Sequence, residues 1–233
     1  MNAETPIRTP RGAFFGRRKG HPLRAGQAGL IENLLPGLAL DLGEPAPRDL
    51  ATLFKAPVDA VRLEIGFGGG EHLLYEARAR PESGFLGCEA YVNGMAKTLA
   101  AIEAEGLNNI RLHHGDALDL IDWLPEGALS RIDILYPDPW PKRRHWKRRF
   151  ISDDRIGRLG RVLRSGGELR FATDWAGYAE WALMRFIRSP LFRWTAERAD
   201  DWRKPWPEFP GTRYEEKARK EGRPPCYLTF LRV

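Results

Sequence analysis

Four acidic residues lie at the ends of short apolar segments: Glu64, Glu89, Asp116 and Asp138. If these segments are parallel strands, their carboxyl ends meet at one edge of a sheet, where ligands bind in such folds. A carboxylate there can accept ribose hydroxyl protons, as Glu89 is placed to do, or attract a cation. The four acids therefore predict a pocket for a nucleoside-type ligand. Asp116 also has a structural interpretation, because Asp is a common N-cap of helices.

A glycine-rich turn, Gly66–Gly70, lies between Glu64 and Glu71. Glycine allows the backbone to approach a ligand closely. The spacing departs from the Gly-x-Gly-x-x-Gly pattern of dinucleotide sites, and the flanking acids oppose a phosphate at the next helix start. A cationic ligand such as S-adenosylmethionine fits better, and an NAD-dependent enzyme is the weakest alternative. A simple tight turn remains open for this loop taken alone.

The segment 137–149 joins a rigid acidic turn to a run of cations. Prolines on both sides of Asp138 fix the backbone and remove hydrogen-bond donors. The run Lys142–Arg149 then has six Lys and Arg in eight positions, with Trp146 available to stack on a base or to pack underneath. The other 31 Lys and Arg balance the 31 Asp and Glu, so this run accounts for the net charge of +6. It predicts contact with a polyanion; the alternative is a solvated basic helix.

The elements that must position these residues alternate along the chain. Five strands are predicted at Val61–Ile65, Phe85–Cys88, Ile110–Leu112, Ile132–Tyr136 and Leu169–Ala172, and five helices at Glu71–Arg80, Val92–Glu105, Ala117–Leu124, Asp153–Leu163 and Trp175–Ser189. Repeated strand–helix units predict a doubly wound parallel sheet with helices on both faces. Strands at Phe192–Ala196 and Tyr227–Val233 predict a final pair around a Trp- and Pro-rich, substrate-facing insertion at about 198–218.

Length and composition predict one globular domain, 28–233, after a flexible basic arm, 1–27, that touches nucleic acid. Glycines and prolines in this arm argue against the amphipathic helix of a transit peptide. We find no signal-peptide core and no apolar run of the roughly 18 residues that a membrane span needs, so we expect a cytoplasmic protein. The two cysteines and the pair His113 and His114 lack the spacing of a disulfide framework or a metal site.

These motifs together resemble the tRNA (guanine-N7)-methyltransferase family of class I S-adenosylmethionine-dependent enzymes. The resemblance is carried by Gly16–Gln27, Glu64–Gly68, Glu89, Asp116, Pro137–Arg149, Ala172–Trp175 and Thr212–Lys217. It departs at Tyr91 and Gly69, where the family often has other residues, and this bears on how adenosine packs. The resemblance implies a Rossmann-like, seven-stranded, mostly parallel sheet whose last two strands form an antiparallel hairpin.

The same resemblance implies methyl transfer from S-adenosylmethionine to N7 of a guanosine in the variable loop of tRNA, at position 46. It implies cofactor contacts from Glu64, Gly66, Gly68, Glu89, Asp116, Ala117 and Asp138, with Asp138 also catalytic. It implies substrate contacts from Lys142, Asp174, Thr212, Arg213, Tyr214 and Glu215, and RNA contacts from Arg17, Arg18, Arg144, His145, Trp146, Lys147, Arg148 and Arg149. No metal is expected, and the chain is expected to be a monomer or a homodimer.

The expected chemistry needs alignment more than a base, because guanine N7 has an in-plane lone pair and no proton to remove. A carboxylate such as Asp138 can stabilise the positive charge that develops on the purine. Thr212 and Glu215 have capping-box spacing, so a structural role stays open for them. Two other functions also stay open. Pro-Asp-Pro-Trp is similar to the turns of exocyclic-amine methyltransferases, and a non-catalytic RNA-binding protein with a degenerate pocket is the other alternative.

Overall fold

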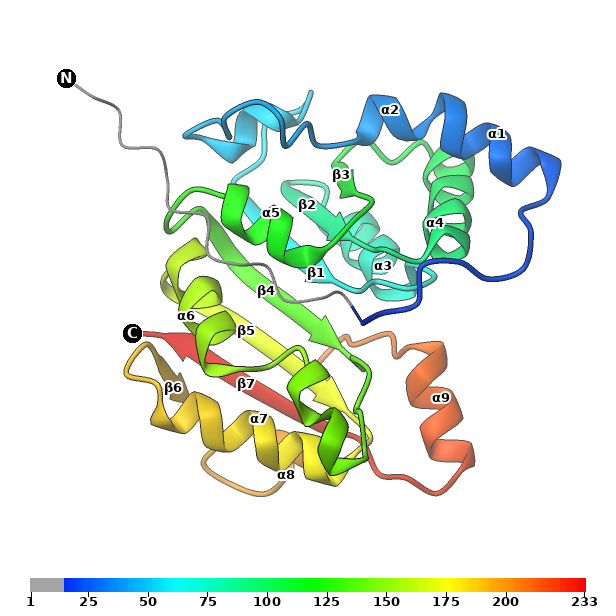
Figure 1. Ribbon diagram of the computed structural model, residues 1–233. Coiled ribbons are helices and arrows are strands. Elements are labelled where there is room, and N and C mark those ends of the chain that lie inside the picture. Colours follow the sequence, from blue (N-terminus) through cyan, green and yellow to red (C-terminus); the bar gives the residue numbers. More distant parts are fainter. Residues whose placement is uncertain (1–14) are drawn as a thin grey trace.

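The computed structural model describes residues 15–233 and contains one seven-stranded sheet (Figure 1). The strands are β1 (Ala60–Ile65), β2 (Ser83–Cys88), β3 (Ile110–His113), β4 (Leu129–Leu135), β5 (Leu163–Thr173), β6 (Phe192–Trp194) and β7 (Cys226–Arg232). Their order is β3-β2-β1-β4-β5-β7-β6. Pairing is parallel from β3 to β5, and β7 is antiparallel to both β5 and β6. The predicted sheet, with its terminal antiparallel pair, is confirmed.

Helices flank the sheet on both faces. They are α1 (Ala25–Asn33), α2 (Leu35–Leu38), α3 (Glu71–Ala79), α4 (Val92–Glu105), α5 (Ala117–Trp123), α6 (Asp153–Val162), α7 (Ala176–Arg188), α8 (Asp200–Arg203) and α9 (Arg213–Lys220), with 3-10 turns η1 (Leu50–Leu53) and η2 (Arg143–Arg148). Apolar side chains of α5, α6 and α7 form the larger buried cluster with one face of the sheet. Those of α3 and α4 pack on the other face, with α1 outside α4. The layers are those of a doubly wound α/β fold.

The strand order reverses between β1 and β4, and this reversal determines where a ligand can bind. β1 pairs with β2 on one side and with β4 on the other, so the chain leaves the sheet in opposite directions at this point. The loops that follow β1 and β4 therefore diverge at the carboxyl edge and leave a crevice there. At this edge of the sheet, Glu89, Asp116 and Asp138 lie one to three residues beyond the ends of β2, β3 and β4, whereas Glu64 lies within β1.

The start of β5 is the strand boundary that differs most from the predictions, for reasons local to the backbone. β5 begins at Leu163, well before the predicted Leu169, because Ser165–Gly167 stays in the strand. Gly166 adopts a left-handed φ of 72°, and the pairing with β4 shifts register between Leu129 and Arg131. Such an irregularity resembles a turn in the sequence.

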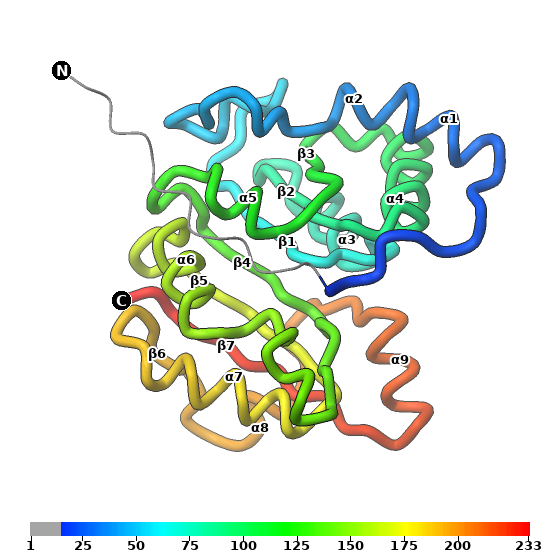
Figure 2. The backbone as a smooth tube through the Cα atoms, in the orientation of Figure 1, coloured from blue at the N-terminus to red at the C-terminus, as the bar shows by residue number. Residues whose placement is uncertain are grey.

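The N-terminal part of the predicted arm, residues 1–14, lies outside the described residues. From residue 15 the chain runs past the start of α4 to α1, as Figure 2 shows in dark blue. The Arg18 carbonyl accepts a hydrogen bond from the Val92 amide at 3.0 Å, and the Asn93 side chain bonds to Gly20 and His21. Across residues 15–233 no helix has the length and apolarity to cross a membrane.

Candidate active site

The glycine-rich loop after β1 contains three glycines in the left-handed region. The φ angles are 73° at Gly66, 58° at Gly68 and 78° at Gly70. A side chain at these positions would be strained, so the alternate spacing, which does not match a dinucleotide motif, suits this backbone. Gly70 is also the N-cap of α3. The loop thus presents bare backbone at the carboxyl end of β1.

Glu89 ties this loop to the end of β2. Its two carboxylate oxygens accept from the backbone amides of Gly68, at 2.6 Å, and Tyr91, at 2.8 Å. Burial raises the pKa of Glu89, although these amides favour its charged form. A carboxylate has about four acceptor positions, so the group retains capacity for the hydroxyls of a ligand. Its position agrees with the predicted ribose contact.

Glu64 lies beneath the loop. It is 5% exposed, is absent from the cavity wall, and accepts a hydrogen bond from Nδ1 of His72 on α3 at 2.7 Å. Burial raises the pKa of Glu64. Burial opposes charge on His72 too, but the adjacent carboxylate raises the pKa of its imidazole. The hydrogen bond thus joins the end of β1 to the first turn of α3, the two elements that flank the loop.

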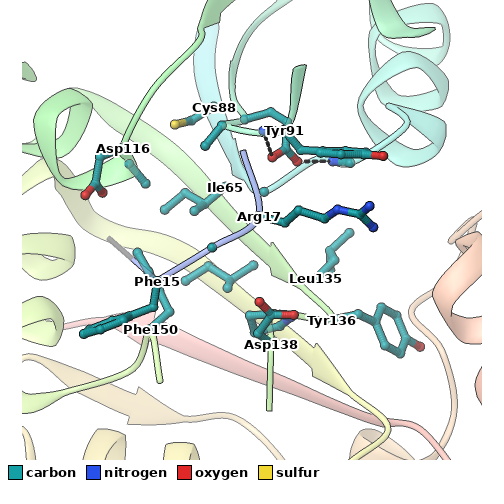
Figure 3. Close-up of a pocket in the computed structure, with 18 of the residues that line it drawn as sticks. Phe15, Arg17, Ile65, Cys88, Tyr91, Asp116, Leu135, Tyr136, Asp138 and Phe150 are labelled. Atoms are coloured by element: carbon teal, nitrogen blue, oxygen red, sulfur yellow. Dashed lines mark hydrogen bonds between the residues drawn. The ribbon is translucent and has the colours of Figure 1, made fainter. Parts of the chain in front are cut away.

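Asp116 caps a helix and also lines the cavity. Its Oδ1 accepts from the Leu118 amide at 3.0 Å and caps α5, and the residue lines the cavity beside Ala117. In Figure 3, Asp116 and Asp138 lie on different sides of the cavity. Capping fixes the Asp116 carboxylate in place, which a ligand contact also requires.

The turn that carries Asp138 is held in an unusual conformation. Tyr136 and Trp140, on either side of it, adopt left-handed φ angles of 50° and 43°, which cost energy in residues other than glycine. The buried side chain of Arg149 donates to the Pro139 carbonyl at 2.9 Å and to the Gly177 carbonyl at 3.1 Å. Desolvation by the surrounding protein raises the pKa of the Asp138 carboxyl. The turn thus presents a fixed carboxylate to the crevice.

These loops enclose a cavity of about 520 Å³, within the usual range for small-molecule sites. Its wall includes the predicted residues Gly66, Gly68, Glu89, Asp116, Ala117, Asp138, Arg148, Arg17, Arg213 and Tyr214. It also includes Tyr91, which the family resemblance had singled out, and residues that the sequence analysis did not identify, among them Phe15, Tyr136, Trp140, Phe150 and Arg155. The missed residues are mostly aromatic and carry no charge pattern. Only the prolines beside Asp138 could have signalled that the neighbours of this residue line a site.

The basic run after this turn divides into exposed and inward-facing cations. Lys142, Arg143, Arg144 and Lys147 are exposed, and His145 is half-buried. Arg148 lies over the ring of Trp140 at 4.9 Å, at the cavity wall. Arg149, which was predicted to contact RNA, is only 2% exposed and holds the Asp138 turn, so its predicted RNA contact does not fit the structure.

Trp146 packs underneath the run, which was one of the two roles considered for it. Its ring meets that of Trp181 edge to face, with the centroids 5.4 Å apart, and its indole N–H donates to the Pro141 carbonyl at 3.2 Å. The run forms the 3-10 turn η2 (Arg143–Arg148) and not a solvated α-helix.

The predicted substrate residues at the start of α9 fall into two groups, those with structural contacts and those that line the cavity. Thr212 accepts from the Glu215 amide at 3.1 Å, so one half of the capping box forms. The Glu215 carboxylate is buried and does not complete the box; it accepts from the Tyr227 hydroxyl and the Arg219 guanidinium, both at 2.7 Å. Arg213 and Tyr214 reach the cavity wall.

Asp174 forms an ion pair with Arg223 at 2.6 Å, and it lies directly after β5. Lys142 is exposed at the start of η2 and does not line the cavity. Arg18 is exposed beside the start of α4. Within residues 15–233, no His, Cys, Asp or Glu cluster has the arrangement of a metal site.

Comparison with known proteins gives long matches. The family model "Putative methyltransferase" matches residues 59–228. A tRNA (guanine-N(7)-)-methyltransferase of Rhodopseudomonas palustris strain BisB5 is 62% identical over 222 residues, covering 95% of this chain and 87% of the relative. The protein of that name from Agrobacterium fabrum is 56% identical over 220 residues, with coverages of 94% and 95%.

Solved structures share the fold at low identity. The 16S rRNA methyltransferase KamB has a TM-score of 0.58 at 19% identity, covering 82% of this chain and 95% of its own. A protein from Streptococcus mutans titled "a putative methyltransferase", in complex with SAH, has a TM-score of 0.51 at 11% identity, with coverages of 87% and 97%. Because the sequence matches are both long and close, the chain belongs to the tRNA (guanine-N7)-methyltransferase family.

Proposed function

We propose that this protein transfers a methyl group from S-adenosylmethionine to N7 of a guanosine in the tRNA variable loop, at position 46, and that it does so in the cytoplasm. The observation that carries the proposal is the continuity of the segment 137–149. One short turn supplies a cavity carboxylate, Asp138, and leads at once into exposed cations suited to phosphates. Membership of the family supports the choice of N7 and of tRNA.

The cavity has the chemistry that the methyl donor needs. Glu89 keeps acceptor capacity for ribose hydroxyls, and Asp116 is fixed near the adenine end that we assign. Glu71 occupies the first turn of α3 and pairs with Lys97 at 2.7 Å, so a phosphate would meet a carboxylate there. A nucleoside without phosphate is therefore the better occupant. When bound, the donor supplies an electrophilic methyl group on a sulfonium.

The residues of the chain have positioning and electrostatic roles in this proposal. The Asp138 turn is rigid, because two prolines and the buried Arg149 fix it, and it can hold the purine in line with the methyl group. The Asp138 carboxylate faces the charge that develops on the purine ring and stabilises it without taking a proton. Lys142 and the exposed arginines of η2 bind phosphates and orient the tRNA.

The test is mass spectrometry of nucleosides from a defined tRNA transcript incubated with the protein and the methyl donor. We expect 7-methylguanosine, and none from a matched transcript with adenosine at the target position. An N7 product also makes the RNA backbone cleavable after reduction and mild base treatment, which locates the site. A product methylated on an exocyclic amine would refute the N7 assignment. Donor and tRNA binding without any product would indicate an RNA-binding protein.

A further inference from the structure

We propose that Arg213 binds the α-carboxylate of the methyl donor. This inference rests on the proposed function and reassigns a residue that the sequence analysis placed with the RNA substrate. It follows from the charges that line the cavity and from the position of Arg213 above the glycine-rich loop.

The donor carries one carboxylate, and the cavity wall holds three, those of Glu89, Asp116 and Asp138. A ligand carboxylate among them needs a cation as a partner, because like charges would otherwise repel it. Four arginines line the cavity: Arg17, Arg148, Arg155 and Arg213. The carboxylate therefore has four possible partners in the wall.

Two of these arginines are less suitable, Arg155 because of its hydrogen bonds and Arg148 because of its position. Nη1 of Arg155 donates to the backbone carbonyls of Arg149 and Phe150, at 2.8 and 3.1 Å. The guanidinium of Arg148 lies over the rings of Phe15 and Trp140, at 5.0 and 4.9 Å, in the wall that carries Asp138. That wall faces the reacting methyl group in our assignment, not the far end of the donor.

Arg213 lies against the glycine-rich loop instead. A Cβ atom built on Gly68 would be 3.2 Å from Nη2 of Arg213, and the amide of Gly68 is bound to Glu89 at 2.6 Å. The positive charge of Arg213 reaches Glu89 and favours its ionised form. Arg213 is thus next to the carboxylate that we assign to the ribose. Across residues 15–233 no carboxylate forms an ion pair with Arg213.

The shape of the donor then places its carboxylate. With the ribose at Glu89 and the adenine toward Asp116, the amino-acid end extends the opposite way, along the bare backbone of Gly66–Gly68. Arg213 stands at that end. Its Nη2 donates to the Tyr214 hydroxyl at 3.1 Å, and the guanidinium lies 4.9 Å from the centre of that ring, which orients it. The fork of an arginine can bind a carboxylate with two hydrogen bonds.

Arg17 is the remaining competitor. Its guanidinium lies 5.4 Å from the centre of the Tyr91 ring, and its Nε donates to the Lys19 carbonyl at 3.1 Å. It therefore stacks on Tyr91, whose backbone amide is bound to Glu89, the residue that we assign to the ribose. We therefore assign the carboxylate to Arg213, and the experiment distinguishes the two.

The experiment measures calorimetric affinity, without tRNA, for two ligands: S-adenosylhomocysteine and the same molecule lacking its carboxylate. Four full-length proteins are compared with the wild type: Arg213→Gln, Arg213→Lys, Arg17→Gln and, as a matched control on the exposed side of α9, Lys217→Gln. We expect Arg213→Gln to weaken S-adenosylhomocysteine by about 10- to 100-fold, as for one charge-assisted contact, and to leave the other ligand nearly unchanged. Arg213→Lys should recover part of the loss.

Three results would overturn the assignment: equal losses for both ligands, no loss for either, or a carboxylate-dependent loss in Arg17→Gln alone. A raised KM for tRNA in Arg213→Gln with unchanged donor affinity would return the residue to the RNA. Melting curves verify that each variant is folded, and Arg213 is exposed enough to be replaced safely. Failure of the wild type to bind either ligand would instead refute the proposed function, so the two failures are distinguishable.

Discussion

Replacing Gly94 with alanine is expected to displace the glycine-rich loop. Gly94 is the third residue of α4, and a Cβ atom built on it would lie 2.2 Å from the Gly68 carbonyl oxygen and 2.9 Å from the Gly68 carbonyl carbon. Both are backbone atoms, so no side chain can rotate away to relieve the clash. A carbon–oxygen contact needs about 3.3 Å, and the loop or the helix must therefore move by about 1 Å.

The size of the effect follows from two opposing contributions. Overpacking of this kind costs about 1–3 kcal/mol, and alanine recovers up to about 1 kcal/mol because it has a higher helix propensity than glycine. We expect the free energy of unfolding to fall by about 1–2 kcal/mol, which lowers Tm by about 2–8 °C in a chain of this size. The same movement disturbs the 2.6 Å bond between the Gly68 amide and Glu89, so donor affinity should fall by about tenfold or more.

The assay combines thermal melting with calorimetric titration of S-adenosylhomocysteine, and Gly157→Ala is the control. Gly157 lies in α6 and is exposed, and a Cβ atom added to it would meet no other atom within 4 Å. The free energy of unfolding of this variant should rise by up to about 1 kcal/mol, and its affinity for S-adenosylhomocysteine should match that of the wild type. If Gly94→Ala kept both the melting temperature and the affinity of the wild type, the close approach of α4 to the loop would be wrong. Equal losses of stability and affinity in both variants would show that the effect comes from replacing any helical glycine and not from the contact with Gly68.

Three further predictions concern charge. Asp138→Asn should lower kcat about 10²- to 10³-fold with little change in donor affinity, and full turnover would refute its electrostatic role. Lys142→Ala should raise KM for tRNA. It should also reduce the slope of logarithmic tRNA affinity against logarithmic salt concentration by the contribution of about one phosphate contact. An equal loss of donor affinity would instead show that Lys142 has a structural role. His72 faces Glu64 and Asp133, and its pKa is raised above the ordinary 6.5. The stability that this raised pKa confers is therefore complete below pH 6.5 and is lost as the pH rises through the raised value. The difference in unfolding free energy between wild type and His72→Gln should shrink over that range, and a pH-independent difference would contradict the assignment.

The sequence alone predicts most of the elements, because the apolar strands and their flanking turns are local patterns. The ends of β1, β2 and β3 are within two residues of their predicted positions, as are the helices between them. The family resemblance added the sheet topology. The start of β5 escaped prediction, because Gly166 and Gly167 indicate a turn unless the partner strand is known.

The candidate site was predictable in its acids and less so in its geometry. Glu89, Asp116 and Asp138 were predicted at strand ends and line the cavity. The different position of Glu64 depends on His72, a partner in the first turn of α3 that no pattern marks. The folding of α9 over the loop likewise depends on contacts between residues far apart in the chain. Such contacts are tertiary, and periodicity carries no information about them.

The burial of Arg149 changes how mutations in the basic run should be interpreted. An alanine at this position removes a clamp on two carbonyls, so it deforms the turn that presents Asp138 even when no nucleic acid is present. An alanine scan of the run would therefore combine losses of RNA affinity with distortion of the Asp138 turn. Because each neutralised phosphate contributes about 0.7 to 0.9 to the logarithmic salt slope, the slope counts only the side chains that reach the solvent. A count of cations along the run therefore overstates the expected number of phosphate contacts by at least this one arginine.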